Sequence, residues 1–281
     1  MFVAVDIGKT TTRVASSRDL KDIYRIEKFP TLRTLEEEKE AIKKTVAKVS
    51  DNEKTNLAVV GVPGIIDRNA RSFYRISIYP DLIGEPFSKL LYGCIETQNV
   101  LVENDCLLAG FSEALAGSGK EFDVVSYIGL GTGVGGVRIA FKEIDYSYYF
   151  SEPGHQIIVH GGRQDPFCGS KGCVQAYISG AVFEEIYKVK PEDCKDEKIW
   201  EDYSGYLFCA LNNVISMWTP EVIILGGGLS NKFDFFYPGL INHFKNQFIF
   251  PIPEIRKSAF GDDAGIKGAI LLMSKVTEKA V

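Results

Sequence analysis

The sequence predicts a two-lobed α/β protein. A chain of 281 residues is long for one hydrophobic core and short for three, so two compact lobes of ordinary size are expected. Apolar runs of strand type alternate with stretches of helical periodicity, and several of the predicted strands end at glycine-rich turns. Each element is a weak indication alone, but their order along the chain is informative.

The bulk composition is that of an ordinary soluble globular protein, with 45% hydrophobic and 25% charged residues. A formal net charge of -5 argues against a nucleic-acid surface, which would need a basic face. No apolar run approaches the roughly 18 to 20 residues of a membrane span, and residues 1–5 are too few for the apolar core of a signal peptide. Six scattered cysteines show no disulfide framework, so reduced thiols in a cytoplasm are expected.

A strand, a tight glycine turn and a second strand are expected at the N-terminus. Residues 2–5 and 12–15 are the strand-type runs, and the turn between them begins with Asp6, Gly8 and Lys9. Its amides and threonine hydroxyls suit phosphate oxygens, and its carboxylate suits hydrated magnesium, but the same composition is typical of a polar hairpin tip. The Gly-x4-Gly-Lys-Ser/Thr spacing of a Walker A loop is missing.

Residues 34–49 predict a helix. Thr34 and Glu37 make a capping box at its start, and apolar side chains recur on one face. The charged residues at positions 36–40, together with the lysines that follow, are expected to form a solvated face.

Two buried strands follow, at residues 57–62 and 99–102. The first ends at Pro63 and Gly64, where a turn is expected to reverse the chain. The second delivers Asp105 to the start of a helix, which is where open α/β sheets place their chemistry. Asp is also a common helix N-cap, so capping alone is the competing interpretation.

A second glycine hairpin is expected near the middle of the chain. Residues 124–130 and 137–141 are strand-type runs, and residues 131–136 between them match Gly-x-Gly-x-x-Gly. The dinucleotide-binding version of this pattern needs a helix next, and the protein-kinase version needs His-Arg-Asp and Asp-Phe-Gly motifs that are missing from the sequence. The remaining interpretation is a turn whose backbone amides approach a phosphate closely.

The C-terminal half predicts helices around one further strand. Gly226, Gly227 and Gly228 follow that strand, and they allow a flat or polyphosphate ligand to lie against bare backbone; a loose turn is the alternative. The expected elements are helices at residues 174–187, 200–218 and 262–274, a charged break at residues 188–196, and a strand at residues 221–225.

Residues 151–177 hold the densest set of polar and metal-binding side chains. Glu152, His155 and Gln175 provide a carboxylate, an imidazole and an amide, which suit a polyhydroxylated ligand because each offers directional donors or acceptors. Cys168 and Cys173 with a nearby histidine are typical of a zinc loop, since thiolate and neutral imidazole are preferred zinc ligands. A Cys-x4-Cys pair is also typical of two unrelated buried thiols.

The order of these features resembles the actin and sugar-kinase superfamily, with two strand-glycine-strand hairpins, an Asp at a strand end between them, and a strand followed by three glycines. Within that superfamily, the sequence resembles the ROK family (repressors, open reading frames, kinases) over essentially its whole length. The motifs that carry the resemblance are Asp6-Ile7-Gly8-Lys9-Thr10, Val62-Pro63-Gly64, Asn104-Asp105, Gly131-Thr132-Gly133-Val134-Gly135-Gly136, Glu152-Pro153-Gly154-His155, Cys168-Gly169-Ser170-Lys171-Gly172-Cys173 and Ile224-Leu225-Gly226-Gly227-Gly228.

The resemblance implies a two-lobed actin-like ATPase fold of the ribonuclease H-like class, with ATP in the cleft between the lobes and a sugar deeper in it. The N-terminal lobe is expected over residues 1–104, completed by a C-terminal helix at residues 263–281. The C-terminal lobe is expected over residues 105–262, and it carries the loop with the cysteines and His155.

The resemblance also implies roles for individual residues, carried over by position. Asp105 is the expected catalytic base, which takes the proton from the sugar hydroxyl that attacks the γ-phosphate, and Asp6 is expected to orient hydrated magnesium. Sugar contacts are expected from Asn104, Glu152, His155, Gln175 and Gly64. Phosphate contacts are expected from Gly8, Lys9, Thr10, Thr132 and Gly133, and adenosine contacts from Gly226 and Gly227.

One departure from the family pattern concerns zinc. The family loop normally has the pattern Cys-x-Cys-Gly-x-x-Gly-Cys, but Pro166 occupies the first cysteine position. The remaining zinc ligands are His155, Cys168 and Cys173, with water, His160 or Asp165 as alternatives for a fourth position. Without zinc, hydrogen bonds and packing must shape the loop that presents His155.

Two further departures lie at Gln175 and Lys9. Gln175 stands where the family usually has a glutamate that contacts the sugar; the amide keeps an acceptor, adds a donor and removes a charge, which bears on the sugar or anomer that fits. Lys9 stands where the family usually has glycine, and it either faces solvent or adds a cation near the polyphosphate.

The predicted function is that of an ATP- and magnesium-dependent sugar kinase acting on a hexose such as glucose or fructose. The alternatives are an N-acylhexosamine kinase and a non-catalytic sugar-sensing ROK protein, against which Asp105 argues because a pure sensor needs no base. A DNA-binding repressor is disfavoured, because ROK repressors carry a helix-turn-helix domain before the first hairpin and this chain starts at that hairpin. The resemblance suggests a homo-oligomer, either a dimer or a tetramer.

Overall fold

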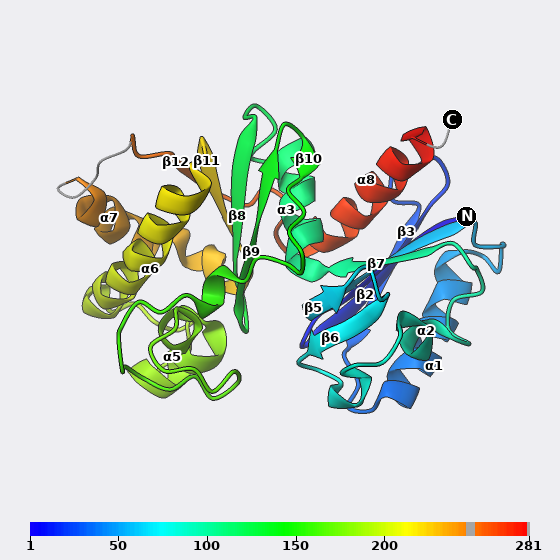
Figure 1. Ribbon diagram of the computed structural model, residues 1–281, viewed down its shortest axis with the longest axis horizontal. Helices are drawn as coiled ribbons and strands as arrows, with labels where there is room; N and C mark the ends of the chain where they lie inside the picture. The colour runs from blue at the N-terminus through cyan, green and yellow to red at the C-terminus, as the bar shows by residue number, and fades with distance from the viewer. Residues whose placement is uncertain (246–250, 280–281) are drawn as a thin grey trace. The chain divides into compact units, whose positions relative to one another are not determined.

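The computed structural model describes residues 1–245 and 251–279, which form two compact units (Figure 1). The lobe boundary expected from the sequence lies before Asp105, whereas the two units divide after Ser112, inside the helix that begins at Asp105. None of the helices in the two described ranges is long and apolar enough to cross a membrane. Unit 1 comprises Met1–Ser112, Tyr146–Phe150 and the C-terminal segment from Asp263, and unit 2 comprises Glu113–Asp145 and Ser151–Asp262.

Unit 1 is built on a five-stranded sheet in the order β3-β2-β1-β4-β7. β1 pairs with β2 antiparallel and with β4 parallel, and β7 continues the parallel part. The parallel strands are nearly continuous apolar runs, which is why the sequence predicts them, whereas the edge strand β3 alternates exposed and half-buried residues and is not predicted. The strands are β1 (Phe2–Ile7), β2 (Thr11–Ser17), β3 (Arg25–Pro30), β4 (Leu57–Val62) and β7 (Val100–Asn104).

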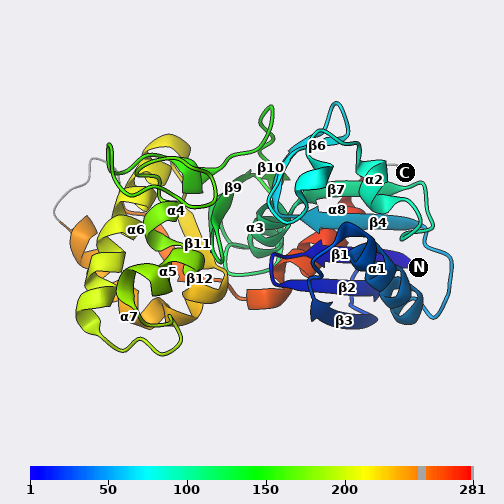
Figure 2. The same ribbon diagram turned by 90° about the horizontal axis from the view of Figure 1, so that it is seen from below.

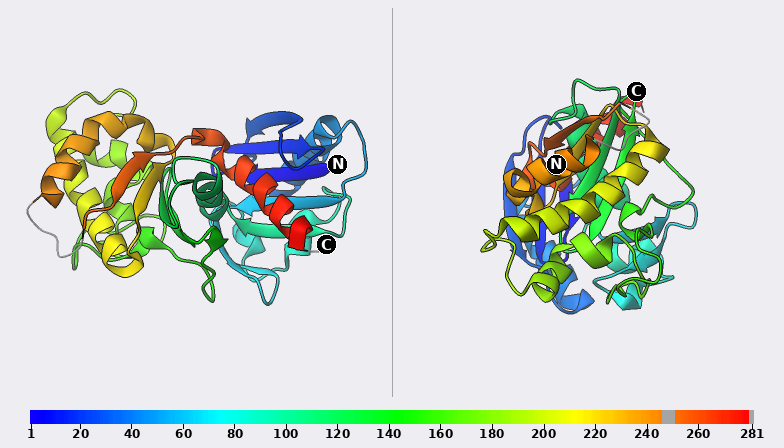
Figure 3. Two further views of the ribbon diagram at one scale, coloured as in Figure 1. Left: turned by 90° about the horizontal axis from the view of Figure 1, so that it is seen from above. Right: turned by 90° about the vertical axis from the view of Figure 1, so that its left-hand side faces the viewer.

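Helices cover both faces of this sheet (Figures 2 and 3). α1 (Leu35–Val49) packs on β2 and β3, and α8 (Ala264–Lys279) packs on β1 and β4 from the other face. The expected cap of α1 is confirmed, since the Thr34 hydroxyl accepts a hydrogen bond from the Glu37 amide at 3.3 Å. α8 continues beyond its expected end at residue 274.

The expectation that residues 36–40 form a solvated face is wrong for Glu38. Its side chain is buried in unit 1. One carboxylate oxygen accepts from the Thr12 hydroxyl at 2.5 Å, and the other accepts from the Leu32 amide at 2.8 Å. Helical periodicity does not reveal this burial, because the donors that compensate for it come from β2 and from the segment before the helix.

A small hairpin and two short helical elements occupy residues 64–91, which the sequence leaves largely unordered. The expected chain reversal after β4 is replaced by a bend at Pro63, after which the chain enters β5 directly. Gly64 has a φ of 143°, and a Cβ there would lie 2.1 Å from the Arg75 carbonyl oxygen, so this position requires glycine. The elements are β5 (Gly64–Asp67), β6 (Ser72–Ile76), the 3-10 helix η1 (Pro80–Leu82) and α2 (Phe87–Leu91).

Unit 2 repeats the sheet pattern of unit 1, in the order β10-β9-β8-β11-β12. β8 and β9 form an antiparallel hairpin, and β8, β11 and β12 run parallel. Because a strand rather than a helix follows the second glycine turn, the exclusion of a dinucleotide motif is confirmed. The strands are β8 (Val124–Leu130), β9 (Val134–Ala140), β10 (Glu143–Ile144), β11 (Val222–Gly226) and β12 (Glu254–Lys257).

The helices of unit 2 share one hydrophobic core with β8 and β11. The single helix expected at residues 174–187 is two helices, broken at Ser179, whose backbone is extended. The break arises because the amides of Gly180 and Ala181 donate to the carbonyls of Gly131 and Thr132, at 2.8 and 3.3 Å, instead of continuing the first helix. The helices are α4 (Gln175–Ile178), α5 (Gly180–Tyr187), α6 (Glu197–Trp218) and α7 (Phe233–Phe244), with 3-10 helices η2 (Pro153–His155), η3 (Gly228–Lys232) and η4 (Gly261–Asp263).

We expect Gly268→Ala to destabilise the protein by about 2 to 3 kcal/mol, because it overpacks unit 1. A Cβ on Gly268 would lie 1.8 Å from the backbone carbonyl oxygen of Leu108, so α8 and the first turns of the helix at Asp105 must move apart. Denaturant unfolding measures the loss. Val276→Ala, at an exposed position of α8, serves as the control and should change the free energy of unfolding by less than about 0.5 kcal/mol. Equal stability of the two variants would contradict this packing.

Candidate active site

The carboxyl ends of β1, β4 and β7 bring Asp6, Gly61 and Asp105 together within unit 1. Asp6 pairs with Gly61 in the parallel register of β1 and β4. A Cβ added to Gly61 would lie 3.4 Å from Oδ1 of Asp6 and 3.7 Å from the Cα atom of Asp105. The Asp6 carboxylate and the Asp105 backbone therefore both lie next to one glycine, at the sheet edge where open α/β folds place their chemistry.

Asn104, not Asp105, caps the helix α3 (Asp105–Leu115). Its Oδ1 accepts from the Leu107 amide at 3.0 Å, and its Nδ2 donates to the Gly64 carbonyl at 2.9 Å. Two of the predicted sugar contacts, Asn104 and Gly64, are thus joined directly. Asp105 is half-buried and accepts from the Cys106 amide at 2.8 Å, so the capping role that competed with catalysis belongs to its neighbour.

The tip of the β1–β2 hairpin exposes Lys9 and Thr10. Thr31 holds this tip in place, since its hydroxyl donates to the Gly8 carbonyl at 2.7 Å and its amide donates to the Thr10 carbonyl at 3.1 Å. The predicted phosphate contacts Gly8, Lys9 and Thr10 therefore share one well-anchored turn, and the buried Asp6 lies just before it in β1.

Thr132, Gly133, Gly226 and Gly227 gather at the carboxyl ends of β8 and β11 in unit 2, which are parallel neighbours. Gly227 has a φ of 78°, and a Cβ there would lie 2.6 Å from the Leu130 carbonyl oxygen, so the two strand ends are in main-chain contact. The residues predicted to contact phosphate and adenosine are therefore brought together by the sheet of this unit.

Glu152 immediately precedes the short η2 turn of unit 2, and His155 is the last residue of that turn. A Cβ on Gly154 would lie 1.9 Å from the Val134 carbonyl oxygen, so η2 packs directly on the start of β9. Burial raises the pKa of Glu152 to about 7. Near neutral pH, its carboxyl group is protonated in part of the population and can donate as well as accept a hydrogen bond.

We expect the wild type to lose stability relative to Glu152→Gln as the pH rises from about 5 to about 8. Because the folded-state pKa of about 7 exceeds the ordinary value of 4.5, the contribution of Glu152 is complete below the ordinary pKa and is lost as the pH rises through the folded one. Melting temperatures across this range measure the difference. The control, Glu184→Gln on the exposed face of α5, should follow the wild type at every pH. A pH-independent gap between wild type and Glu152→Gln would refute the assignment.

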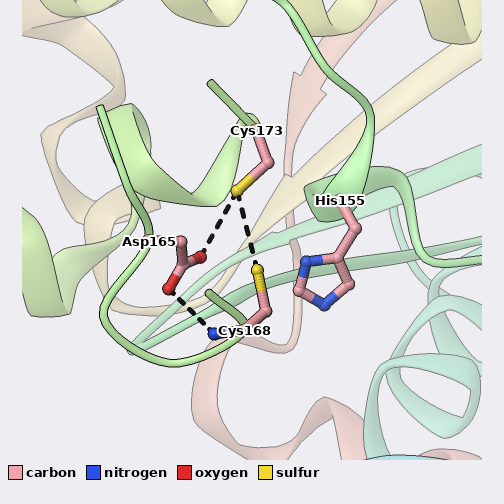
Figure 4. A group of neighbouring side chains, drawn as sticks. All are labelled: His155, Asp165, Cys168 and Cys173. Carbon is pink, nitrogen blue, oxygen red and sulfur yellow. Dashed lines mark hydrogen bonds between the residues drawn. The ribbon is translucent and has the colours of Figure 1, made fainter. Parts of the chain in front are cut away.

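Four potential zinc ligands converge in unit 2, and Figure 4 shows their arrangement. The Sγ atoms of Cys168 and Cys173 are 3.9 Å apart, and Sγ of Cys173 lies 3.4 Å from Oδ2 of Asp165. Ligand atoms around tetrahedral zinc are roughly 3.3 to 3.8 Å apart, given bonds of about 2.0 to 2.3 Å, so this donor set fits a zinc ion. The set is His155, Asp165, Cys168 and Cys173, whose ligand atoms all lie within 4.8 Å of one another.

Asp165 is fully buried and accepts four hydrogen bonds. Oδ1 accepts from the amides of Phe167 and Cys168, at 2.6 and 3.3 Å. Oδ2 accepts from Nε2 of Gln175 at 2.8 Å and from the Cys173 thiol at 3.4 Å. Burial raises the pKa of Asp165, but these hydrogen bonds lower it by more, so the group remains a carboxylate.

Gln175 joins this cluster to the second glycine hairpin. While its Nε2 donates to Asp165, its Oε1 accepts from the Val134 amide at 3.1 Å. The side chain is buried, and a Cβ on Gly133 would lie 2.7 Å from Oε1. Gln175 is predicted from the sequence to contact the sugar. In the structure, both its Nε2 and its Oε1 form hydrogen bonds within unit 2.

Comparison with known proteins identifies the family. The ROK family matches residues 2–276 of the sequence. The chain belongs to the ROK family. The N-acetyl-D-glucosamine kinase of Histophilus somni is 30% identical over 242 residues, which cover 76% of this chain and 78% of that relative.

Solved ROK structures share the fold. A ROK glucokinase from Streptomyces griseus, in complex with glucose and AMPPNP, matches with a TM-score of 0.83 at 24% identity, covering 96% of this chain and 98% of that one. A ROK hexokinase from Thermus thermophilus matches with a TM-score of 0.80 at 21% identity, covering 99% of each chain. The predicted two-lobed actin-like fold class is confirmed.

The sequence analysis missed two residues that lie next to the Asp6 carboxylate, Gly61 and Gly265. A Cβ on Gly265 would lie 2.7 Å from Oδ2 of Asp6, so the first turn of α8 approaches that carboxylate closely. A glycine inside a strand pattern is a known signal of close backbone approach, and it would have indicated Gly61. Nothing in the local sequence links Gly265 to Asp6.

Proposed function

We propose that this ROK protein transfers the γ-phosphate of ATP to a hydroxyl group of a hexose, with Asp105 as the general base. Sugar kinase activity itself is supported by the family and by a relative named as a sugar kinase. The position of Asp105 beside Asp6, at the carboxyl ends of the parallel strands, supports its role as the base. Asn104, rather than Asp105, caps α3.

The proposed chemistry in unit 1 is proton removal beside a phosphate-binding turn. Phosphoryl transfer depends mainly on positioning and charge neutralisation, which magnesium supplies at the phosphates when it is bound. Asp105 takes the proton of the attacking sugar hydroxyl, and Asp6 would orient the hydrated ion when it is bound. The hairpin tip contributes phosphate contacts from Gly8, Lys9 and Thr10, and Asn104 and Gly64 contact the sugar.

The proposed contribution of unit 2 is binding and orientation. Thr132 and Gly133 contact phosphate through a hairpin that the α5 amides hold in place, and Gly226 and Gly227 lie against the adenosine. Glu152 and His155 bind sugar hydroxyls, and the pKa of about 7 allows Glu152 to act as donor or acceptor there.

We propose a glucose- or fructose-like hexose as the acceptor. The S. griseus structure, a ROK glucokinase in complex with glucose, supports this class. An N-acylhexosamine is the second candidate, because the H. somni relative is named an N-acetyl-D-glucosamine kinase.

A coupled ADP-release assay with ATP and magnesium tests the function against glucose, fructose, mannose, allose, N-acetylglucosamine and N-acetylmannosamine. Turnover that depends on one of the first four sugars supports the hexose proposal, and turnover on an N-acetylated sugar alone supports the second candidate. If no sugar is phosphorylated while one still raises the melting temperature, the protein is a sugar-sensing binder instead.

We also propose that His155, Cys168 and Cys173 hold a zinc ion. The convergence of the two thiols and the imidazole carries this proposal. The ion, when bound, would cross-link the loop of residues 155–173 and so fix the position of His155. Elemental analysis of protein purified without chelator should give about one zinc per chain, and a stoichiometry near zero would refute it.

A further inference from the structure

Gln175, one departure of this chain from the ROK pattern, is hydrogen-bonded to the residue that precedes another departure, Pro166. Pro166 replaces the first cysteine of the zinc loop, and Gln175 replaces the usual glutamate. In the folded unit, Asp165 turns its side chain into the cluster, and its Oδ2 accepts from Nε2 of Gln175 at 2.8 Å. Gln175 is thus in direct contact with Asp165, the residue that precedes Pro166 in the sequence.

We propose that Asp165 is the fourth zinc ligand and that Gln175 is the residue that positions it. This inference rests on the zinc site proposed above. Oδ2 of Asp165 lies 3.4 Å from Sγ of Cys173, close to the spacing of an oxygen and a sulfur that share one tetrahedral zinc ion. Figure 4 shows the Asp165 carboxylate beside the Cys173 thiol, joined to it by a hydrogen bond.

The hydrogen bonds around Asp165 are those that a ligating carboxylate needs. Oδ1 is held by the amides of Phe167 and Cys168, which fix the plane of the carboxylate. Oδ2 accepts from Nε2 of Gln175 and lies 3.4 Å from the sulfur atom of Cys173. Such outer partners orient metal-binding carboxylates, and their loss typically costs about 10-fold to 100-fold in metal affinity.

The same geometry explains why position 175 is glutamine. A glutamate here would keep the oxygen that accepts from the Val134 amide, but its second oxygen would face Oδ2 of Asp165 at hydrogen-bond distance. Two buried carboxylates at that distance repel each other unless one of them is protonated. The carboxylate at position 165 therefore requires a hydrogen-bond donor at position 175, which the amide nitrogen of glutamine supplies. The other end of the Gln175 amide binds the start of β9.

Zinc binding by Asp165→Asn and Gln175→Glu, compared with the wild type, tests the inference. Each protein is stripped of metal, and the zinc dissociation constant is measured by competition with a chromogenic chelator. We expect Asp165→Asn to weaken zinc binding by about 100-fold or more and Gln175→Glu by about 10-fold to 100-fold. The matched control is Gln164→Glu, which makes the same change at an amide that donates to the Gly169 carbonyl at the surface, and it should stay within about 2-fold of the wild type.

A second readout separates a ligand from a residue that only shapes the loop. Zinc raises the melting temperature by an amount that depends on its affinity, so the increment on adding zinc is measured for each variant. Loss of loop packing alone lowers the metal-free and zinc-bound melting temperatures together and leaves the increment unchanged. Loss of a ligand, or of the residue that holds it, reduces the increment itself.

The outcomes distinguish this inference from the zinc proposal. A wild type that binds no zinc overturns both. If the wild type binds zinc, and Asp165→Asn binds it within about 2-fold of the wild-type affinity with an unchanged rise in melting temperature, only the inference about Asp165 is overturned. If Asp165→Asn does not fold, the same two measurements on Gln175→Glu test the inference. Zinc binding by Gln175→Glu with the wild-type affinity would then overturn it.

Discussion

Asp105→Asn is expected to retain sugar binding and to lose about 10³-fold in turnover, because it removes the proton acceptor and almost no volume. The Asn104 side chain, which caps α3 and holds Gly64, is unchanged in this variant, so the surrounding backbone should stay in place. Steady-state kinetics in the ADP-release assay give the loss in turnover, and calorimetric titration of the sugar shows whether binding survives.

The matched control for Asp105→Asn is Asp81→Asn, the same change at an exposed position of η1. It should leave turnover within about 2-fold of the wild type. If Asp105→Asn keeps most of its activity, Asp105 is not the base. If it loses sugar binding and turnover together, its role is in binding rather than in proton transfer.

Glu113→Ala is expected to destabilise the protein by about 3 to 5 kcal/mol. The fully buried carboxylate of Glu113, near the end of α3, accepts from the amides of Ser118, Ala259 and Phe260 at 2.9 to 3.1 Å and from the Ser258 hydroxyl at 2.5 Å. Truncation leaves these donors without their acceptor and opens a cavity. The free energy of unfolding from denaturant titration measures the effect.

Glu113→Gln and Glu121→Ala are the controls for this prediction. Glu113→Gln keeps one acceptor oxygen and should lose less stability than Glu113→Ala. Glu121 is exposed and forms a surface ion pair with Arg256 at 3.6 Å, so its truncation should change stability by less than about 1 kcal/mol. If Glu113→Ala were no worse than Glu121→Ala, the donors around Glu113 would have found other partners.

The sequence predicts the central strands of both units because they are buried on both faces. The nearly continuous apolar runs of β4 and β8 carry that information locally, and their predicted ranges coincide with the observed strands. The edge strand β3 and the hairpin of β5 and β6 escape prediction, since their residues alternate in exposure or are few. The break at Ser179 also escapes, because the carbonyls that cause it lie nearly fifty residues earlier in the chain.

The candidate site was indicated by the sequence as a set of motifs, each of them a few residues long. Asp6, Asp105 and the glycines were identifiable because strand ends and glycine turns are local patterns. Their grouping at the edge of each sheet was an expectation that depended on the order of strands. The distances across Gly61 in unit 1 and between Gly227 and Leu130 in unit 2 come from strand pairing alone.

The sequence by itself determined the family, the two-lobed α/β class and the residue types available for chemistry, because these depend on local patterns and on their order. Tertiary structure alone decided which side chains meet. It assigned the cap of α3 to Asn104, buried Glu38 among donors from other elements, and brought Asp165 to Gln175 and Cys173. The physical reason is that hydrogen bonds and metal sites depend on distances in space, and loop closure brings together residues whose separation along the chain carries no such information.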